Sequence, residues 1–399
     1  MQKSLLIRFI TASGVTNLAD GIATVAWAWL ASLLTRDPLM IALVPVALRL
    51  PWFVCAIPAG IITDRVDRRK LILWMDVLRG LAFVVVALVL WSVTPLVDAP
   101  QTGTSYPAVF GMVLLAAMAV GIAEVFRDNA AQTMLPAIVP HEALEKANGR
   151  LWSVELVGNA LLGPAVGATL IAIAVPLPFA LNALAYVMAV VLIWQMAGHF
   201  RPQTQTDRHW RRELMQAVQF LRGNPLLLAL AWITGFWNLL YEMVAIGLIL
   251  HAQENLNIGA QTYGLILAAG AVGGKRTAQW MLALSAPAFA GMALAPGPVA
   301  LGIVLMLFSF TGLVWNTVSV SYRQRSIPDA MLGRVNSLYR LLAWGMMPVG
   351  LLLSGMIVRL ADAPLGRDLA LTAPFWVGTS GAAVLGELGW RALNRWFPT

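Results

Sequence analysis

Two carboxylates and one guanidinium, Asp20, Glu242 and Arg49, stand inside long apolar stretches of the chain. At the centre of a membrane-spanning helix a charge costs at least about 2.5–3.5 kcal/mol, so such residues are functional candidates. A carboxylate in that position can take up and release a proton or bind a cation. The three residues are therefore candidates for coupling ion movement to another process, the carboxylates as the groups that bind the ion.

Each candidate also has a structural interpretation. Asp20 could form an ion pair with Arg49 of the neighbouring span, and the sequence favours a structural role for Arg49 over a substrate contact. Glu242 is considered as a functional carboxylate because the sequence of Asn238–Glu242 in the second half resembles that of Asn17–Asp20 in the first half. Both interpretations stay open at this point.

The composition decides what kind of element carries these charges. Of the 399 residues, 59% are hydrophobic and 12% are charged, and the mean hydropathy is +0.75. A soluble domain typically carries about a quarter charged residues, so this chain has too little polar surface to cover itself in water. The sequence predicts an all-α polytopic membrane protein.

A short basic hairpin sets the orientation of the spans. Gly60–Lys70 contains six charges, four of them cationic, between two apolar segments. Basic loops stay on the cytoplasmic side. The outer loops assigned from this point contain only two basic residues, Arg36 and Arg367, with Arg359 near an outer helix end. We expect a multi-pass protein of the cell inner (cytoplasmic) membrane with both termini cytoplasmic. The net charge of +8 fits contact with an anionic lipid leaflet, and nucleic acid is not expected as a partner.

The spans form two halves. We expect a six-helix bundle over 1–198, a cytoplasmic amphipathic linker over 199–224 and a second helical bundle over 225–399, with about 12 transmembrane helices in all. Weak internal similarity between the halves supports a six-plus-six repeat. Span eight, Thr262–Gly274, offers about thirteen residues, or about 20 Å of a roughly 30 Å hydrocarbon core, and is predicted to be truncated.

Enzyme chemistry finds no support in the sequence. The segment Ala269–Thr277 resembles a phosphate-binding loop, but its first glycine is replaced by Ala269 and Lys275 is followed by arginine. The single cysteine and four scattered histidines lack the spacing of metal ligands. We expect no enzymatic activity, no cofactor and no metal site.

The hairpin resembles the signature of the major facilitator superfamily between its second and third helices. The matching residues are Gly60, Asp64, Arg65, Arg68 and Arg69. The resemblance implies two six-helix bundles that alternate between inward- and outward-open states, with the hairpin as a conformational latch and the substrate bound near the membrane midplane.

Three further stretches resemble exporters of that superfamily. Gly163, Pro164 and Gly167 in the fifth span are similar to its antiporter signature, although Asn159 and Ala168 stand where glycines are usual. Leu48–Trp52 and Leu332–Asn336 look most like the branch of enterobactin exporters and macrolide-efflux proteins. Ordinary close packing of helices also explains the glycines.

Four polar or aromatic residues near the carboxylates are candidates for lining a substrate cavity: Asn17, Trp27, Trp237 and Asn238. Most of the sixteen tryptophans fit interfacial anchors or lipid-facing positions instead. Glu124, Arg127 and Asp128 are spaced three and four residues apart and are expected to form a local salt-bridge set.

Together these features predict a secondary active transporter, with a proton or cation as coupling ion. The main hypothesis is proton-coupled efflux of a hydrophobic or amphipathic small molecule, such as a drug or siderophore, by a monomer in the lipid bilayer. One alternative is an importer or facilitator of the same fold. The other is a non-transporting membrane protein, because of the short span eight.

Overall fold

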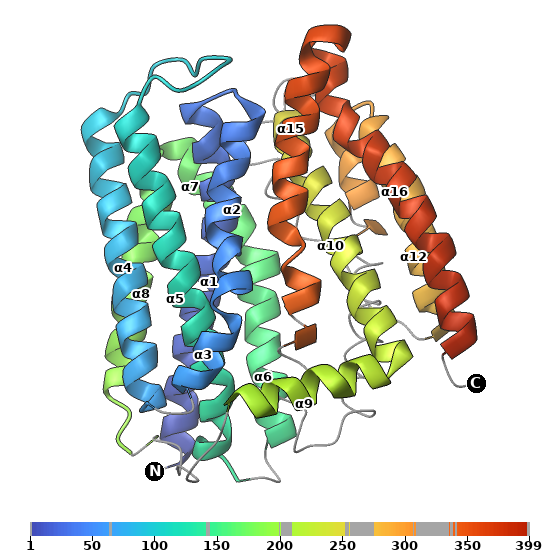
Figure 1. Ribbon diagram of the computed structural model, residues 1–399. Coiled ribbons are helices and arrows are strands. Elements are labelled where there is room, and N and C mark those ends of the chain that lie inside the picture. The colour runs from blue at the N-terminus through green and yellow to red at the C-terminus, as the bar shows by residue number, and fades with distance from the viewer. Residues whose placement is uncertain are drawn as a thin grey trace. The chain divides into compact units, whose positions relative to one another are not determined.

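The computed structural model describes residues 2–63, 66–140, 144–198, 200, 210–251, 255, 275–305, 307–308, 335, 338–339 and 341–396. Every regular element in this part of the chain is a helix (Figure 1). The helices are α1 (Gln2–Leu34), α2 (Pro38–Val54), α3 (Ala56–Thr63), α4 (Arg68–Val93), α5 (Pro107–Ile138), α6 (Leu144–Glu155), the π-helical segment η2 (Leu156–Leu162), α7 (Gly163–Ile173), α8 (Leu177–Trp194), α9 (Trp210–Gly223), α10 (Pro225–Leu250), α12 (Lys275–Ala293), α15 (Met347–Leu365) and α16 (Arg367–Trp396).

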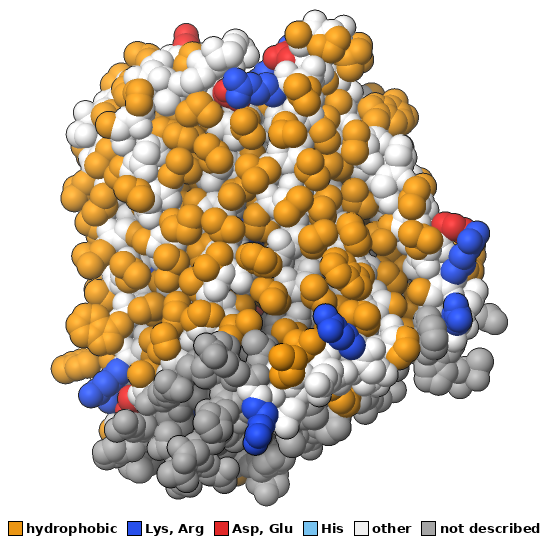
Figure 2. Space-filling model, in the orientation of Figure 1, with side chains coloured by type: hydrophobic (Ala, Val, Ile, Leu, Met, Phe, Trp, Pro, Cys, Tyr) orange, Lys and Arg blue, Asp and Glu red, His pale blue; other side chains and the backbone are white. Residues whose placement is uncertain are grey.

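Eight helical stretches in this part of the chain are long and apolar enough to cross a membrane, and one of them, Ser153–Ile173, joins the end of α6 with η2 and α7. Their outward-facing side chains include many large hydrophobic residues, with Leu115, Trp91 and Trp74 each about 70% exposed. On the face shown in Figure 2 hydrophobic side chains predominate and charged ones are few. A surface of this kind needs lipid around it. The prediction of an all-α polytopic membrane protein is confirmed, whereas the truncated span eight lies outside the described residues.

The first of two compact units contains the described residues of 1–36 and 50–206. Within it α4 packs against α5 and α8, and α1 packs against α7 and α8 (Figure 1). An aromatic cluster fills the space between α1, α4 and α8: Trp27, Phe83, Phe179 and Tyr186 have ring centres 5.0–6.3 Å apart. All four side chains are buried, so the cluster is part of the core of this unit.

The second unit contains the described residues of 37–49, 207–258 and 269–399. In it α10 packs against α15 and α16, and α12 packs against α16. Residues 38–49 of α2 also belong to this unit, whereas the sequence predicted one bundle over 1–198. Gly355 of α15 has no side chain to separate it from α2, and a Cβ there would lie 2.7 Å from the Cα of Leu39.

The linker contains the amphipathic helix that the spacing of its apolar residues predicts. This helix is α9, and its Leu221 is buried against Leu227, Val335 and Leu338 of the second unit. Arg212 and Met215 on other faces of α9 are exposed. The helix is therefore attached to its unit by one apolar edge.

Candidate functional site

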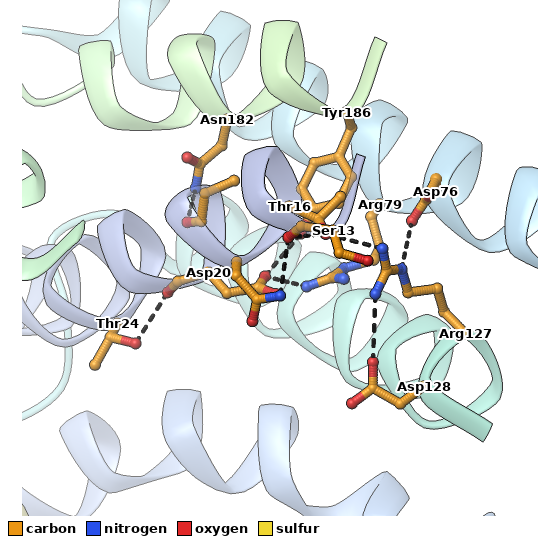
Figure 3. Close-up of polar contacts among 12 residues, drawn as sticks. Ser13, Thr16, Asp20, Thr24, Asp76, Arg79, Arg127, Asp128, Asn182 and Tyr186 are labelled. Carbon is orange, nitrogen blue, oxygen red and sulfur yellow. Dashed lines mark hydrogen bonds and ion pairs between the residues drawn. The ribbon is translucent and has the colours of Figure 1, made fainter. Parts of the chain in front are cut away.

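The first unit contains a buried network of charged side chains contributed by α1, α4, α5 and α8 (Figure 3). At its centre, Arg79 of α4 and the Tyr186 hydroxyl of α8 both donate hydrogen bonds to Oδ1 of Asp20 on α1, the tyrosine at 2.7 Å. The guanidinium of Arg79 also lies over the Tyr186 ring, 4.6 Å from its centre. The Arg79 side chain is 1% exposed and that of Asp20 is 23% exposed. Asp20 is thus the partly accessible end of a buried ion pair.

A second ion pair lies beside the first. Arg127 of α5 donates from Nε to Oδ1 of Asp76 on α4 at 3.3 Å and from Nη2 to the Thr16 hydroxyl on α1 at 2.9 Å. Its Nη1 also lies 3.7 Å from a carboxylate oxygen of Asp128, which is more exposed. Asp76 is fully buried. One arginine therefore ties three helices together.

The helical repeat explains why these side chains meet. Thr16 and Asp20 on α1 are four residues apart, Asp76 and Arg79 on α4 are three apart, and each pair therefore lies on one face of its helix. The two aspartates and two arginines at the centre of the network carry equal and opposite charge. Such balance is what allows charges to remain buried, because an uncompensated one would be strongly destabilising.

Sequence reasoning identified Asp20 but not its partners. The structure pairs Asp20 with Arg79 of the same unit. Arg79 and Asp76 were overlooked, although two opposite charges three residues apart in an apolar span are a usable signal. The set Glu124, Arg127 and Asp128 was expected to be local, but Arg127 also contacts α1 and α4.

The other two coupling candidates lie together in the second unit. The charge of Arg49 interacts with Glu242 and with Tyr241, both on α10. Next to Glu242 in the chain, the Tyr241 ring stacks on Trp237 at 5.5 Å and on Phe308 at 5.7 Å. A carboxylate, a guanidinium and a stack of aromatic rings thus occupy one region.

The four cavity candidates take different positions. Trp27 is 2% exposed inside the aromatic cluster of the first unit. Asn17 donates to the carbonyl of Ser13 within its own helix, and Asn238 is buried and donates to the carbonyl of Ala343. Trp237 is partly exposed and donates from Nε1 to the Ser285 hydroxyl at 3.1 Å. Of the two tryptophans, Trp237 is the less buried.

Arginines of the hairpin bind the carbonyl ends of neighbouring helices in the first unit. Arg68 donates to the carbonyl of Thr133 in α5, and Arg69 donates to the carbonyls of Ile193 and Trp194 at the end of α8. Cations near a helix C-terminus bond to backbone carbonyls there and complement the helix dipole. Gly60 lies in α3 with open space beside it, and Asp64 and Arg65 lie outside the described residues.

Replacing Arg69 with glutamine should lower the free energy of unfolding by about 1–2 kcal/mol, because the α8 carbonyls lose a charged donor. Thermal unfolding in detergent, followed by circular dichroism, measures this. Lys70→Gln is the matched control, since Lys70 is the exposed neighbouring cation. Equal losses in the two variants would contradict a specific role for Arg69.

The glycines of the antiporter-like motif bring α7 against α1. A Cβ on Gly163 would lie 2.5 Å from the Cα of Gly21, and one on Gly167 would lie 2.5 Å from the carbonyl oxygen of Ile22. The segment immediately before them, η2, is a π-helix, whose turns are wider than those of an α-helix. Pro164 cannot donate a hydrogen bond to the carbonyl four residues back, and such a widened turn accommodates the proline. The motif therefore provides both the close approach and the irregular turn.

Adding one methyl group distinguishes this contact from an open glycine. We expect Gly163→Ala to destabilise the protein by about 1–3 kcal/mol, since the backbone of α1 cannot yield as a flexible side chain would. Gly60→Ala should be neutral or stabilising by up to about 1 kcal/mol, because that helical position has room. The melting temperatures of both purified variants test this pair, and an unchanged Gly163→Ala would refute the packing role.

Among the described residues no group of three or more His, Cys, Asp or Glu side chains is arranged to hold a metal ion. The charged groups instead face one another in oppositely charged pairs. A carboxylate in such a pair loses its charge when it binds a proton, which weakens the ion pair.

Comparison with known proteins identifies the family of this chain. A family model described as "Transmembrane secretion effector" matches residues 2–373. The enterobactin exporter EntS of Citrobacter koseri is 26% identical over 314 residues, which cover 72% of this chain and 69% of that protein.

Solved structures of low sequence identity share the fold. An autoinhibited peptide transporter of the POT family superposes with a TM-score of 0.74 at 9% identity, over 99% of this chain and 98% of that one. An inward-facing bacterial homologue of the human lysosomal transporter Spinster gives 0.70 at 12% identity, over 100% and 99%. A bacterial homologue of the iron transporter ferroportin gives 0.68 at 16%, over 98% of each chain.

Proposed function

Because this chain belongs to the transmembrane secretion effector family of the major facilitator superfamily, a family of transporters and not of enzymes, we propose that it is a proton-coupled exporter of a hydrophobic or amphipathic small molecule. The observation that carries the proposal is Asp20, a partly exposed carboxylate on a buried arginine and tyrosine inside a transmembrane unit. A proton that binds there removes the charge that holds Arg79. Contacts that change in this way bias an equilibrium between two conformations.

Export, as opposed to uptake, is supported by the family and by the resemblance to an enterobactin exporter. The glycine and proline residues of the antiporter-like motif agree with it. In an exporter of this kind, protons that enter down their gradient drive the substrate outward. Glu242 with Arg49 in the second unit is proposed as a second coupling pair.

The substrate class is proposed from the second unit. Trp237 and Tyr241 present stacked rings beside the carboxylate of Glu242 and the guanidinium of Arg49. Flat apolar groups bind to stacked rings, and polar groups bind to the two charges. This combination suits an amphipathic molecule with an aromatic part, such as a drug or a siderophore.

The membrane setting is proposed from the positive charge of the inner loops. We propose that both termini are cytoplasmic, that the protein resides in the inner membrane and that the monomer is the working unit. Hairpin residues 60–70 would then act on the cytoplasmic side as the latch between conformations.

Export can be tested in a bacterial host that lacks its own major efflux pumps. Cells that express the chain should resist ethidium or erythromycin better than cells with an empty vector, or should release more enterobactin. Energised cells loaded with ethidium should lose it faster, and a protonophore should abolish the difference. Faster accumulation would favour the importer alternative. The absence of any change with all three compounds would favour the non-transporting alternative.

A further inference from the structure

The buried network of the first unit contains a donor and an acceptor that are both unused. Nε of Arg79 and Oδ2 of Asp76 are buried, and neither has a hydrogen-bond partner among the residues that the structure describes. The two residues lie one turn apart on the same face of α4. Unpaired buried polar groups are rare because each one lowers the stability of the fold. Two such atoms on one helix face therefore indicate a role other than stability.

Arg79 interacts electrostatically with two aspartates but forms a hydrogen bond with only one of them. Its bond goes to Asp20, while its charge also acts on Asp76. Asp76 in turn uses only Oδ1, which accepts the long 3.3 Å bond from Nε of Arg127. Asp76 therefore has one free carboxylate oxygen within one helical turn of a guanidinium that is engaged elsewhere.

We propose that Asp76 is the second acceptor of Arg79 and receives its guanidinium when a proton neutralises Asp20. This inference deepens the proposed function and rests on it only for the source of the proton. The proton adds to a carboxylate oxygen of Asp20, both arginines keep their protons, and no other covalent bond changes. The charge of the two aspartates and two arginines rises from zero to +1.

The exchange moves a buried contact from one helix to another. In the starting state Arg79 links α4 to α1, and after the exchange it pairs within α4. The Tyr186 hydroxyl remains close to Asp20 and can still bond to the neutral carboxyl group. Asp76 is thus a positioning residue. It gives the buried guanidinium of Arg79 a new partner when the contact with α1 is released.

Among the described residues, the other charged groups around Arg79 lie on α5. Glu124 acts on Arg79 electrostatically, Arg127 lies between Asp76 and Thr16, and Asp128 contacts Arg127. Glu124 is the competing acceptor, since it is a further carboxylate that faces Arg79. An experiment must therefore separate Asp76 from Glu124.

A double-mutant cycle on purified protein in one detergent makes this separation. Asp20→Asn and Asp76→Asn each leave Arg79 one aspartate, whereas the double variant leaves it neither. We expect the double variant to lose about 4 °C more in melting temperature than the sum of the two single losses. The matched cycle of Asp20→Asn with Glu124→Gln should be additive. Additive losses in the Asp76 cycle, or an equal excess in the Glu124 cycle, would overturn the proposal.

An experimental structure of the Asp20→Asn variant is the second test and does not need Asp76→Asn to fold. Arg79 should lie within hydrogen-bond distance of Oδ2 of Asp76. If Arg79 still contacts residue 20 and Oδ2 remains unpaired, the inference is wrong. Neither measurement involves transport, so wild-type protein that fails to transport would contradict the proposed function and leave these outcomes to decide the inference.

Discussion

Replacing Asp20 with asparagine is expected to reduce pH-driven efflux at least about tenfold while the protein remains folded. A tenfold change requires only that protonation no longer shifts the balance between the two conformations by about 1.4 kcal/mol. The amide keeps the size of the carboxylate but cannot take up a proton at neutral pH. Arg79 is then held the same way at every pH, so the gradient no longer biases the two conformations. Efflux of ethidium from cells or vesicles under an imposed pH gradient measures the effect.

The matched control is Asp128→Asn, because Asp128 belongs to the same network but is more exposed and contacts Arg127 instead of Arg79. We expect it to retain most of the efflux. Melting temperatures of both variants separate a lost coupling from a lost fold. If Asp20→Asn transports as fast as the wild type under the same gradient, the assignment of Asp20 is wrong.

The largest effect on stability is expected for Arg127→Gln, at about 3–5 kcal/mol in the free energy of unfolding. The substitution leaves the fully buried Asp76 without its hydrogen-bond donor and breaks the link to Thr16 on α1. Chemical or thermal unfolding of the purified variant, followed by circular dichroism, gives the loss.

Two comparisons make this prediction specific. Arg391→Gln removes an arginine of an exposed i,i+4 pair whose side chain is 74% accessible, and it should cost no more than about 0.5 kcal/mol. Arg127→Gln combined with Asp76→Asn removes both buried charges and should recover part of the stability. A loss for Arg127→Gln as small as that for Arg391→Gln would show that the buried pair does not hold the helices together.

The sequence predicted the membrane class and the helices because both depend on composition and on local periodicity. Long apolar runs can only be spans, and α9 follows from the spacing of its apolar residues. The sequence predicted that Gly163 lies where two helices pack closely, since small residues allow helices to approach, and Gly163 does pack against Gly21. The partner of that glycine was not, because many helices could have taken that place.

The partners of Asp20 could not be predicted for a related reason. Which charges meet depends on how each helix is rotated about its axis and on which helices are neighbours, and one sequence determines neither by inspection. Arg49 and Arg79 both lie in spans close to Asp20 along the chain. In the structure Arg79 forms an ion pair with Asp20, and the charge of Arg49 acts on Glu242. Residues 38–49 of α2 group with the second unit, and apolar packing of this kind leaves no specific pattern in the sequence.

Proton flux in proteoliposomes tests the central claim most directly. Vesicles with an acidic lumen and the lumenal pH indicator pyranine are made with wild-type protein and with Asp20→Asn, and ethidium, erythromycin or enterobactin is added outside. The account predicts that at least one compound accumulates in wild-type vesicles while the lumen becomes more alkaline, and that Asp20→Asn abolishes both signals. Accumulation without a change in lumenal pH, or equal proton flux in the two proteins, would contradict it.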